Sequence, residues 1–132
     1  MHTAAELQLL AAAVVIGVVQ LVWATVVATG QRGDLAWGVG PRDEPRPLVG
    51  VAARLERAFS NFMETFPLFA AAVIAAYLAG RLGSLTLWGS GLYVAARALY
   101  APLYALGVPT VRSLVWGVSL VGLLMVTSAI FL

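Results

Sequence analysis

Two stripes of polar side chains interrupt an otherwise apolar sequence, and both have helical spacing. The first stripe has intervals of three, four and three residues and consists of Arg54, Arg57, Asn61 and Glu64. The second has intervals of four, three and four residues and consists of Tyr93, Arg97, Tyr100 and Tyr104. Side chains at these intervals lie on one face of an α-helix, so each stripe predicts one polar helix face.

The residue types in these stripes favour an anionic ligand that also carries an amine. Guanidinium groups bind carboxylates through paired hydrogen bonds, and a carboxylate beside an asparagine can hold an ammonium group. The zone is net positive, because it contains Arg54, Arg57, Arg97 and Arg112 against Glu56 and Glu64. Glutathione, with two carboxylates and one amine, has the matching form. A nearby guanidinium would also lower the pKa of its thiol by favouring the thiolate.

Glu64 lies too deep in the second apolar segment to be a surface residue. Only 16 residues remain from Thr65 to Gly80, fewer than the roughly 20 that span a bilayer. A carboxylate at that depth is costly unless it is paired or faces a polar cavity. A binding site is one interpretation. The other is an internal ion pair of Glu64 with Arg57 or Arg97 that only fixes helix packing.

Composition indicates an integral membrane protein. The 132 residues are 61% hydrophobic and 11% charged, against roughly half and a quarter in soluble domains. Four apolar stretches predict an all-α bundle of four transmembrane helices in one domain, residues 1–132, with helices at about 4–29, 48–79, 85–106 and 110–131. The net charge of +2 argues against a nucleic-acid partner. The absence of cysteine excludes disulfides, thiolate metal sites and a cysteine nucleophile.

Arginine placement predicts the orientation of the chain in its membrane. Seven arginines fall on the side of the first and third connections, namely Arg32, Arg42, Arg46, Arg54, Arg57, Arg97 and Arg112. Arg81 alone falls on the opposite side. By the positive-inside rule, the first and third loops are cytoplasmic and both termini lie outside. The short loops look bacterial, so we expect the inner membrane of a bacterium.

Residues 56–69 resemble the superfamily of membrane-associated proteins in eicosanoid and glutathione metabolism. In that family an arginine, an asparagine and a glutamate at this spacing, followed by a proline-containing turn, bind glutathione. Arg57, Asn61 and Glu64 match these three residues directly. Members often carry a tyrosine after the glutamate, where this chain has Thr65. The resemblance covers nearly the whole chain.

Residues 96–104, with Arg112 and Ser113 after them, resemble the same family. Its paired tyrosines fall on Tyr100 and Tyr104. Its arginine that opens the last helix and stabilises the thiolate falls on Arg112, which the resemblance makes the catalytic residue. The resemblance further implies a homotrimer, with each glutathione held between two neighbouring subunits near the cytoplasmic face.

The stripes and the resemblance together lead us to expect a membrane-bound, glutathione-dependent transferase or peroxidase that acts on lipophilic electrophiles. Apart from the catalytic Arg112, the expected glutathione-binding residues are Arg32, Arg54, Arg57, Asn61, Glu64, Arg97, Tyr100, Tyr104 and Ser113. The alternative is a glutathione-binding or membrane-organising protein without catalysis. A small multidrug transporter fits less well, because such transporters carry an acidic residue near the middle of the first helix, where this chain has Gln20.

Overall fold

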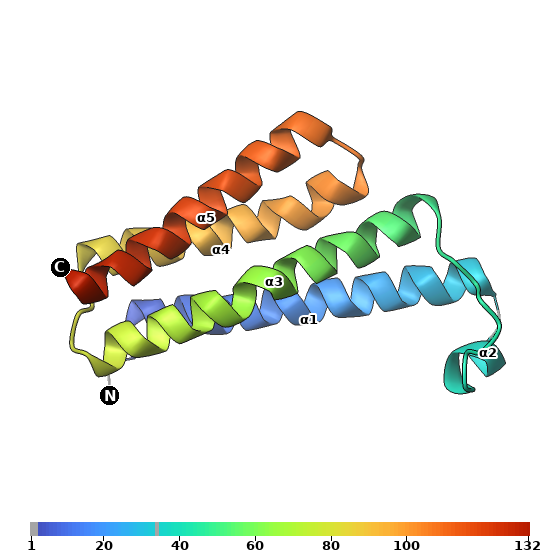
Figure 1. The fold of residues 1–132 in the computed structure, drawn as a ribbon, viewed down its shortest axis with the longest axis horizontal. Helices are drawn as coiled ribbons and strands as arrows, with labels where there is room; N and C mark the ends of the chain where they lie inside the picture. The colour runs from blue at the N-terminus through green and yellow to red at the C-terminus, as the bar shows by residue number, and fades with distance from the viewer. Residues whose placement is uncertain (1–2, 34) are drawn as a thin grey trace.

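The fold of this chain, a computed structural model that describes residues 3–33 and 35–132, consists of helices and their connections. The helices are α1 (Ala5–Arg32), α2 (Leu35–Val39), α3 (Gly50–Leu78), α4 (Ser84–Ala105) and α5 (Pro109–Phe131). The four long helices run side by side, and α2 lies beyond one end of the bundle (Figure 1). The prediction of an all-α chain is therefore confirmed, and no strand occurs within the described ranges.

The first predicted helix and the first predicted loop differ from the structure. The helix was expected to end at Thr29, but α1 continues to Arg32 and is closed by Gly33, whose left-handed backbone has φ 69°. The segment from Gln31 to Pro47, expected to be a loop, contains the five-residue helix α2. Such a short helix leaves no periodic signal in a sequence.

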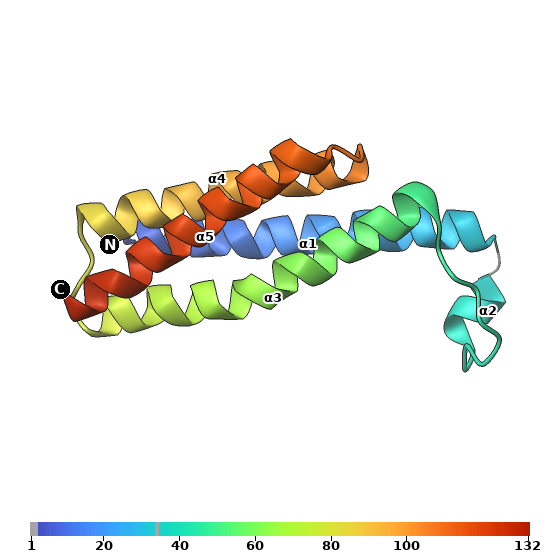
Figure 2. The ribbon, with the colours of Figure 1, turned by 45° about the horizontal axis from the view of Figure 1, so that its top comes forward.

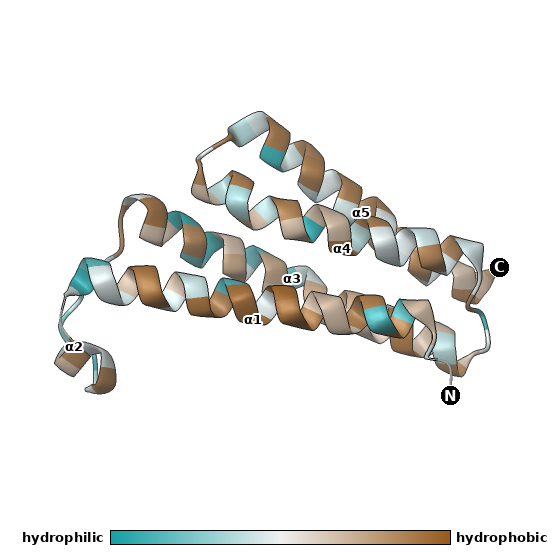
Figure 3. Ribbon diagram, turned by 180° about the vertical axis from the view of Figure 1, so that it is seen from behind, coloured by the Kyte–Doolittle hydropathy of each residue, from teal (hydrophilic) through white to brown (hydrophobic). Residues whose placement is uncertain are grey.

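Three of the helices, α1, α3 and α5, are long and apolar enough to cross a membrane, as judged over the described residues. Helix α1 places apolar side chains outward, and Val15, Val19 and Val26 are each more than half exposed. Its buried positions instead include Glu6 and Gln20. This inverted distribution is expected of a helix whose outer face meets lipid rather than water, and Figure 3 shows the apolar colouring along α1.

Helices α4 and α5 form an antiparallel pair whose backbones touch. A Cβ atom built on Gly122 would lie 2.5 Å from the carbonyl oxygen of Gly89, and one built on Gly89 would lie 2.7 Å from that of Gly122. No side chain larger than hydrogen fits at either position without a shift of the helices. Small residues at helix contacts are the usual device for close packing inside membranes.

Aromatic packing joins α3 to α4 in the core of the bundle. The rings of Phe69 and Tyr93 are stacked with centroids 4.0 Å apart, and both side chains are fully buried. Pro67 lies inside α3, which bends near its middle (Figure 2), because proline removes one helical hydrogen bond. Towards the end of the bundle near α2, α5 diverges from α3 (Figure 1), whereas the end of α4 stays bonded to α3 through Arg54 and Arg57.

We expect Gly122→Ala to destabilise the protein, because the new methyl group would collide with the backbone of α4. Overpacking of this kind costs about 1–3 kcal/mol. Thermal unfolding in detergent, followed by circular dichroism, measures the loss. Gly117→Ala is the matched control, because a Cβ atom on Gly117 of the same helix meets nothing within 4 Å. Equal stability of the two variants would contradict the proposed close contact.

Candidate functional site

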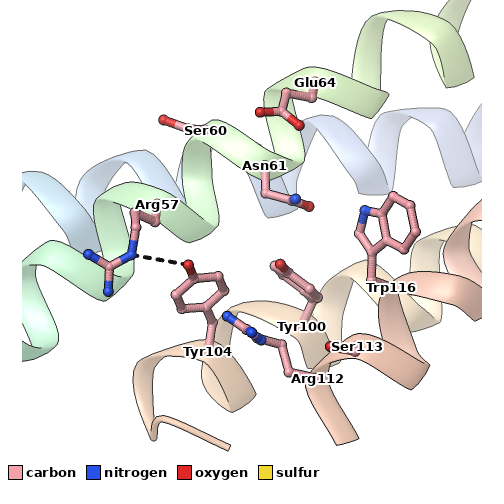
Figure 4. Close-up of a pocket in the computed structure, with 9 residues that line it drawn as sticks. All are labelled: Arg57, Ser60, Asn61, Glu64, Tyr100, Tyr104, Arg112, Ser113 and Trp116. Atoms are coloured by element: carbon pink, nitrogen blue, oxygen red, sulfur yellow. Dashed lines mark hydrogen bonds between the residues drawn. The ribbon is translucent and has the colours of Figure 1, made fainter. Parts of the chain in front are cut away.

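A cavity of about 460 Å³ is lined by α3, α4 and α5. We call it the α3–α5 cavity (Figure 4). Its lining is Arg57, Ser60, Asn61 and Glu64 from α3, Tyr100 and Tyr104 from α4, and Arg112, Ser113 and Trp116 from α5. Seven of the ten residues expected at a glutathione site thus lie around one cavity. The three others, Arg32, Arg54 and Arg97, do not line it.

The α3 side of the cavity follows directly from helix geometry. Its four lining residues are spaced by three, one and three positions and so form one face of the helix. The opposite face carries Ala58, Phe62 and Phe69, which are buried in the bundle. The same helix therefore fixes its position with one face and supplies polar groups with the other.

Tyr104 lies between the two arginines of the cavity. The Nε atom of Arg57 donates a hydrogen bond of 3.1 Å to the hydroxyl oxygen of Tyr104. The guanidinium carbon of Arg112 lies 4.4 Å from the centre of the Tyr104 ring. Tyr100 meets the same ring edge-on, with centroids 5.6 Å apart. This arrangement holds both guanidiniums in place while their terminal nitrogens make no hydrogen bond to any described residue, which leaves them available for a ligand.

Glu64 faces the cavity without an ion-pair partner. No arginine of the described chain lies within 4.0 Å of its carboxylate, although Arg97 is near enough to interact with it electrostatically. The alternative of a packing ion pair between Glu64 and Arg57 or Arg97 is therefore not observed. With two arginines and one glutamate, the lining carries one net positive charge.

Arg97 lies behind the cavity wall and is 1% exposed. Its Nη1 atom donates a hydrogen bond of 2.9 Å to the side-chain oxygen of Asn61. Its guanidinium carbon also lies 4.3 Å from the centre of the Tyr100 ring, a favourable cation–π distance. Arg97 uses one lone pair of the Asn61 amide oxygen, and the NH₂ group of Asn61 makes no hydrogen bond to the described chain, so it can donate to a ligand. Arg97 thus positions Asn61 and is not itself exposed to the cavity.

Arg54 and Arg32 have structural contacts elsewhere. The Nε atom of Arg54 donates to the carbonyl oxygen of Ala105, 3.0 Å away, at the last residue of α4. A cation at this position is favourable, because the last carbonyls of a helix carry partial negative charge. Arg32 donates to the carbonyl oxygen of Arg46, and its guanidinium lies 4.5 Å from the centre of the Trp37 ring. Neither side chain reaches the α3–α5 cavity of its own chain.

Ser60 and Trp116 line the cavity but were not expected there. Ser60 follows Arg57 by three positions, so the helical spacing of the stripe already contained the signal. Trp116 follows Arg112 by four positions and lies on the same face of α5. Its indole gives the otherwise polar cavity an apolar wall. From sequence alone, tryptophan in such a chain is more often an anchor at the membrane interface.

The model of the MAPEG family matches residues 9–132. The chain belongs to the MAPEG family. The match includes the whole α3–α5 cavity and confirms the resemblance found in the sequence. This family includes glutathione transferases and peroxidases. A search of curated proteins finds no match to the chain.

Thr65, where this MAPEG chain departs from the common family pattern, has a structural role. Its side chain is 9% exposed, and its Oγ1 atom lies 2.9 Å from the hydroxyl oxygen of Tyr93 in the core between α3 and α4. Thr65 does not line the cavity, because its side chain is buried against Tyr93.

We expect Thr65→Val to lower the stability of the protein by about 1–3 kcal/mol, because it leaves the buried hydroxyl of Tyr93 without this partner. The double variant Thr65→Val, Tyr93→Phe should recover most of the loss, since neither polar group remains. A double-mutant cycle by thermal unfolding in detergent measures the coupling. Additive losses in the double variant would show that the two hydroxyls do not interact.

Proposed function

We propose that this MAPEG protein is a membrane-bound, glutathione-dependent transferase or peroxidase for lipophilic electrophiles. The observation that carries the proposal is that Arg57, Arg112 and Glu64 all line one cavity of about 460 Å³. Glutathione carries two carboxylates and one ammonium group. It therefore complements a lining with two guanidiniums, one carboxylate and one net positive charge.

Each polar group of the lining has a role in this proposal. The guanidinium of Arg57 and the NH₂ group of Asn61 are donors for glutathione carboxylates, and Glu64 is the acceptor for the ammonium group. Tyr100, Tyr104 and Ser113 add hydroxyl groups that orient the peptide. Arg32 would contact glutathione only across a boundary between subunits, since it lies outside the cavity of its own chain.

Arg112 is the proposed catalytic residue. Glutathione supplies a thiol nucleophile when bound, and the guanidinium of Arg112 would stabilise the thiolate form. Arg112 lies in the first turn of α5, where backbone N–H groups add partial positive charge. Its ring contact with Tyr104 holds the guanidinium at the cavity while leaving its N–H groups for the ligand. The Trp116 wall would receive the apolar part of an electrophile that arrives through the membrane.

We further propose that α4 is the fourth span and that three copies assemble into a homotrimer in the inner membrane of a bacterium. The first and third loops would be cytoplasmic and the termini outside. The close α4–α5 contact supports α4 as a span, because α5 is itself long and apolar enough to cross. The apolar outer faces of the helices supply the surface that lipid and neighbouring subunits would cover.

We expect calorimetric titration of the detergent-purified protein with glutathione to show saturable binding that Arg57→Ala and Glu64→Gln each weaken. Loss of one charged hydrogen bond should reduce affinity by about tenfold to a hundredfold. Arg81→Ala is the control, because it removes the same charge from the exposed α3–α4 turn. Absence of binding in a well-folded wild-type protein would contradict the proposal.

We expect Arg112→Gln to lower kcat for conjugation of an aryl halide by about 10²–10³-fold, the usual cost of losing one charge-stabilising donor. Removing the guanidinium should raise the pKa of the bound thiol. The rise of activity with pH must then move to higher pH in the variant. The pH profile of kcat measures this shift. A profile with an unchanged midpoint would assign thiolate stabilisation to another group, and glutathione binding without turnover in the wild type would favour the non-catalytic alternative.

A further inference from the structure

Two polar side chains buried in the bundle, one on α1 and one on α4, have hydrogen-bonding groups without a partner. Gln20 of α1 is 4% exposed, and neither its amide oxygen nor its amide nitrogen is bonded to the described chain. Arg97 of α4 uses Nη1 for Asn61, but its Nε and Nη2 atoms have no partner there. Leaving buried polar groups unpaired is costly, so most of them in native proteins are bonded.

The ring of Phe62 on α3 lies close to both α1 and α4 near these two side chains. A Cβ atom built on Gly17 of α1 would lie 2.9 Å from the Cε1 atom of the Phe62 ring. The guanidinium carbon of Arg97 lies 5.6 Å from the centre of the same ring. Gly17 and Gln20 are three residues apart and therefore lie on one face of α1. Gln20 thus lies one helical turn from the residue of α1 that meets the Phe62 ring.

Helix register also places Gln20 at the level of Arg97. Ala13 of α1 and Tyr93 of α4 belong to one buried cluster. The two helices are in contact and run in the same direction, because both begin at the end of the bundle where the chain starts (Figure 1). Gln20 follows Ala13 by seven residues and Arg97 follows Tyr93 by four. The difference of three residues is about 4.5 Å, which the side chain of an arginine can span.

We propose that Gln20 is a positioning residue for the α3–α5 cavity, joined to Arg97 through one buried water. The Gln20 amide and the two unpartnered nitrogens of Arg97 supply the polar partners that a buried water usually has, about three in number. Water-mediated bonds of this kind are nearly as favourable as direct ones.

Arg97 carries the effect of Gln20 to the cavity. Its Nη1 atom holds the amide oxygen of Asn61, whose NH₂ group is a donor to glutathione in the proposed function. The series of hydrogen bonds then runs from α1 through α4 to α3 and fixes the direction of a donor that Gln20 does not touch. This role rests on the proposed function, because it adds a residue that determines the affinity for glutathione.

A role of Gln20 in packing alone would have the opposite effect on stability. Methionine is an apolar side chain of similar length. If the amide of Gln20 is simply unpaired, Gln20→Met should leave the protein equally or more stable, with unchanged binding of glutathione. If the amide is linked to Arg97, the same substitution leaves two donors of a buried guanidinium without a partner and must lower stability.

We expect Gln20→Met to weaken glutathione binding in calorimetric titration by about threefold to thirtyfold, as for a residue that acts through a network. KM for glutathione should rise by the same factor while kcat at saturating glutathione is unchanged, because Arg112 lies outside this series of bonds. Gln8→Met, the same change at an exposed position of α1, is the matched control. Gln20→Glu should keep the wild-type affinity, because its carboxylate accepts the same bond.

Two double-mutant cycles test the link itself. In thermal unfolding without ligand, Gln20→Met should lower the stability of the wild type but not that of Arg97→Met, which has no guanidinium. Gln20→Met should likewise have no further effect on glutathione affinity in Asn61→Ala.

Unchanged affinity in Gln20→Met, an equal loss of affinity in Gln20→Glu, a loss that persists in Asn61→Ala, or additive losses of stability would each overturn the inference. Absence of glutathione binding in the wild type would instead overturn the proposed function. The unfolding cycle, which needs no glutathione, would still decide whether Gln20 and Arg97 are linked.

Discussion

Glu64 belongs to α3, a helix long and apolar enough to cross a membrane, and a carboxylate in such a helix must face either a counter-ion or a polar cavity. Glu64 lines the α3–α5 cavity. No arginine of the described chain lies within ion-pair distance of it. The surrounding structure is arranged to make this possible. Phe69 and Tyr93 stack between α3 and α4, Pro67 accompanies the bend of α3, and α5 then diverges from α3 beside the polar groups.

The arginines near the cavity divide into two kinds by whether they line it. Arg97 is buried behind the wall and bonded to Asn61, and Arg54 is bonded to the end of α4, so neither lines the cavity. Arg57 and Arg112 do line it, and both contact Tyr104. Arg54 and Arg97 join α3 to α4, whereas Arg57 and Arg112 give the lining its positive charge. In the proposed function, Arg57 and Arg112 bind glutathione because their terminal nitrogens are available at the cavity.

Periodicity in the sequence was sufficient to predict the long helices and the polar face of α3, since apolar stretches of that length have few other structures available. Periodicity could not show that Arg97 is packed inside the bundle whereas Tyr100 lines the cavity. Both residues lie on one stripe of α4, and which part of that stripe meets the cavity depends on how α4 packs against α3 and α5. Helix α2 was missed because its segment is held by tertiary bonds, such as that from Trp37 to the carbonyl of Glu44.

The ultraviolet difference spectrum of glutathione mixed with the purified protein at neutral pH tests most directly whether the α3–α5 cavity stabilises a thiolate. We predict a thiolate absorption band that grows with protein concentration and saturates with the occupancy of the site. S-methylglutathione, which has no ionisable thiol, should displace glutathione and remove the band. Saturable binding without any thiolate band would contradict a catalytic α3–α5 cavity and leave only a binding protein. Absence of both binding and the thiolate band would show that the α3–α5 cavity is not a glutathione site.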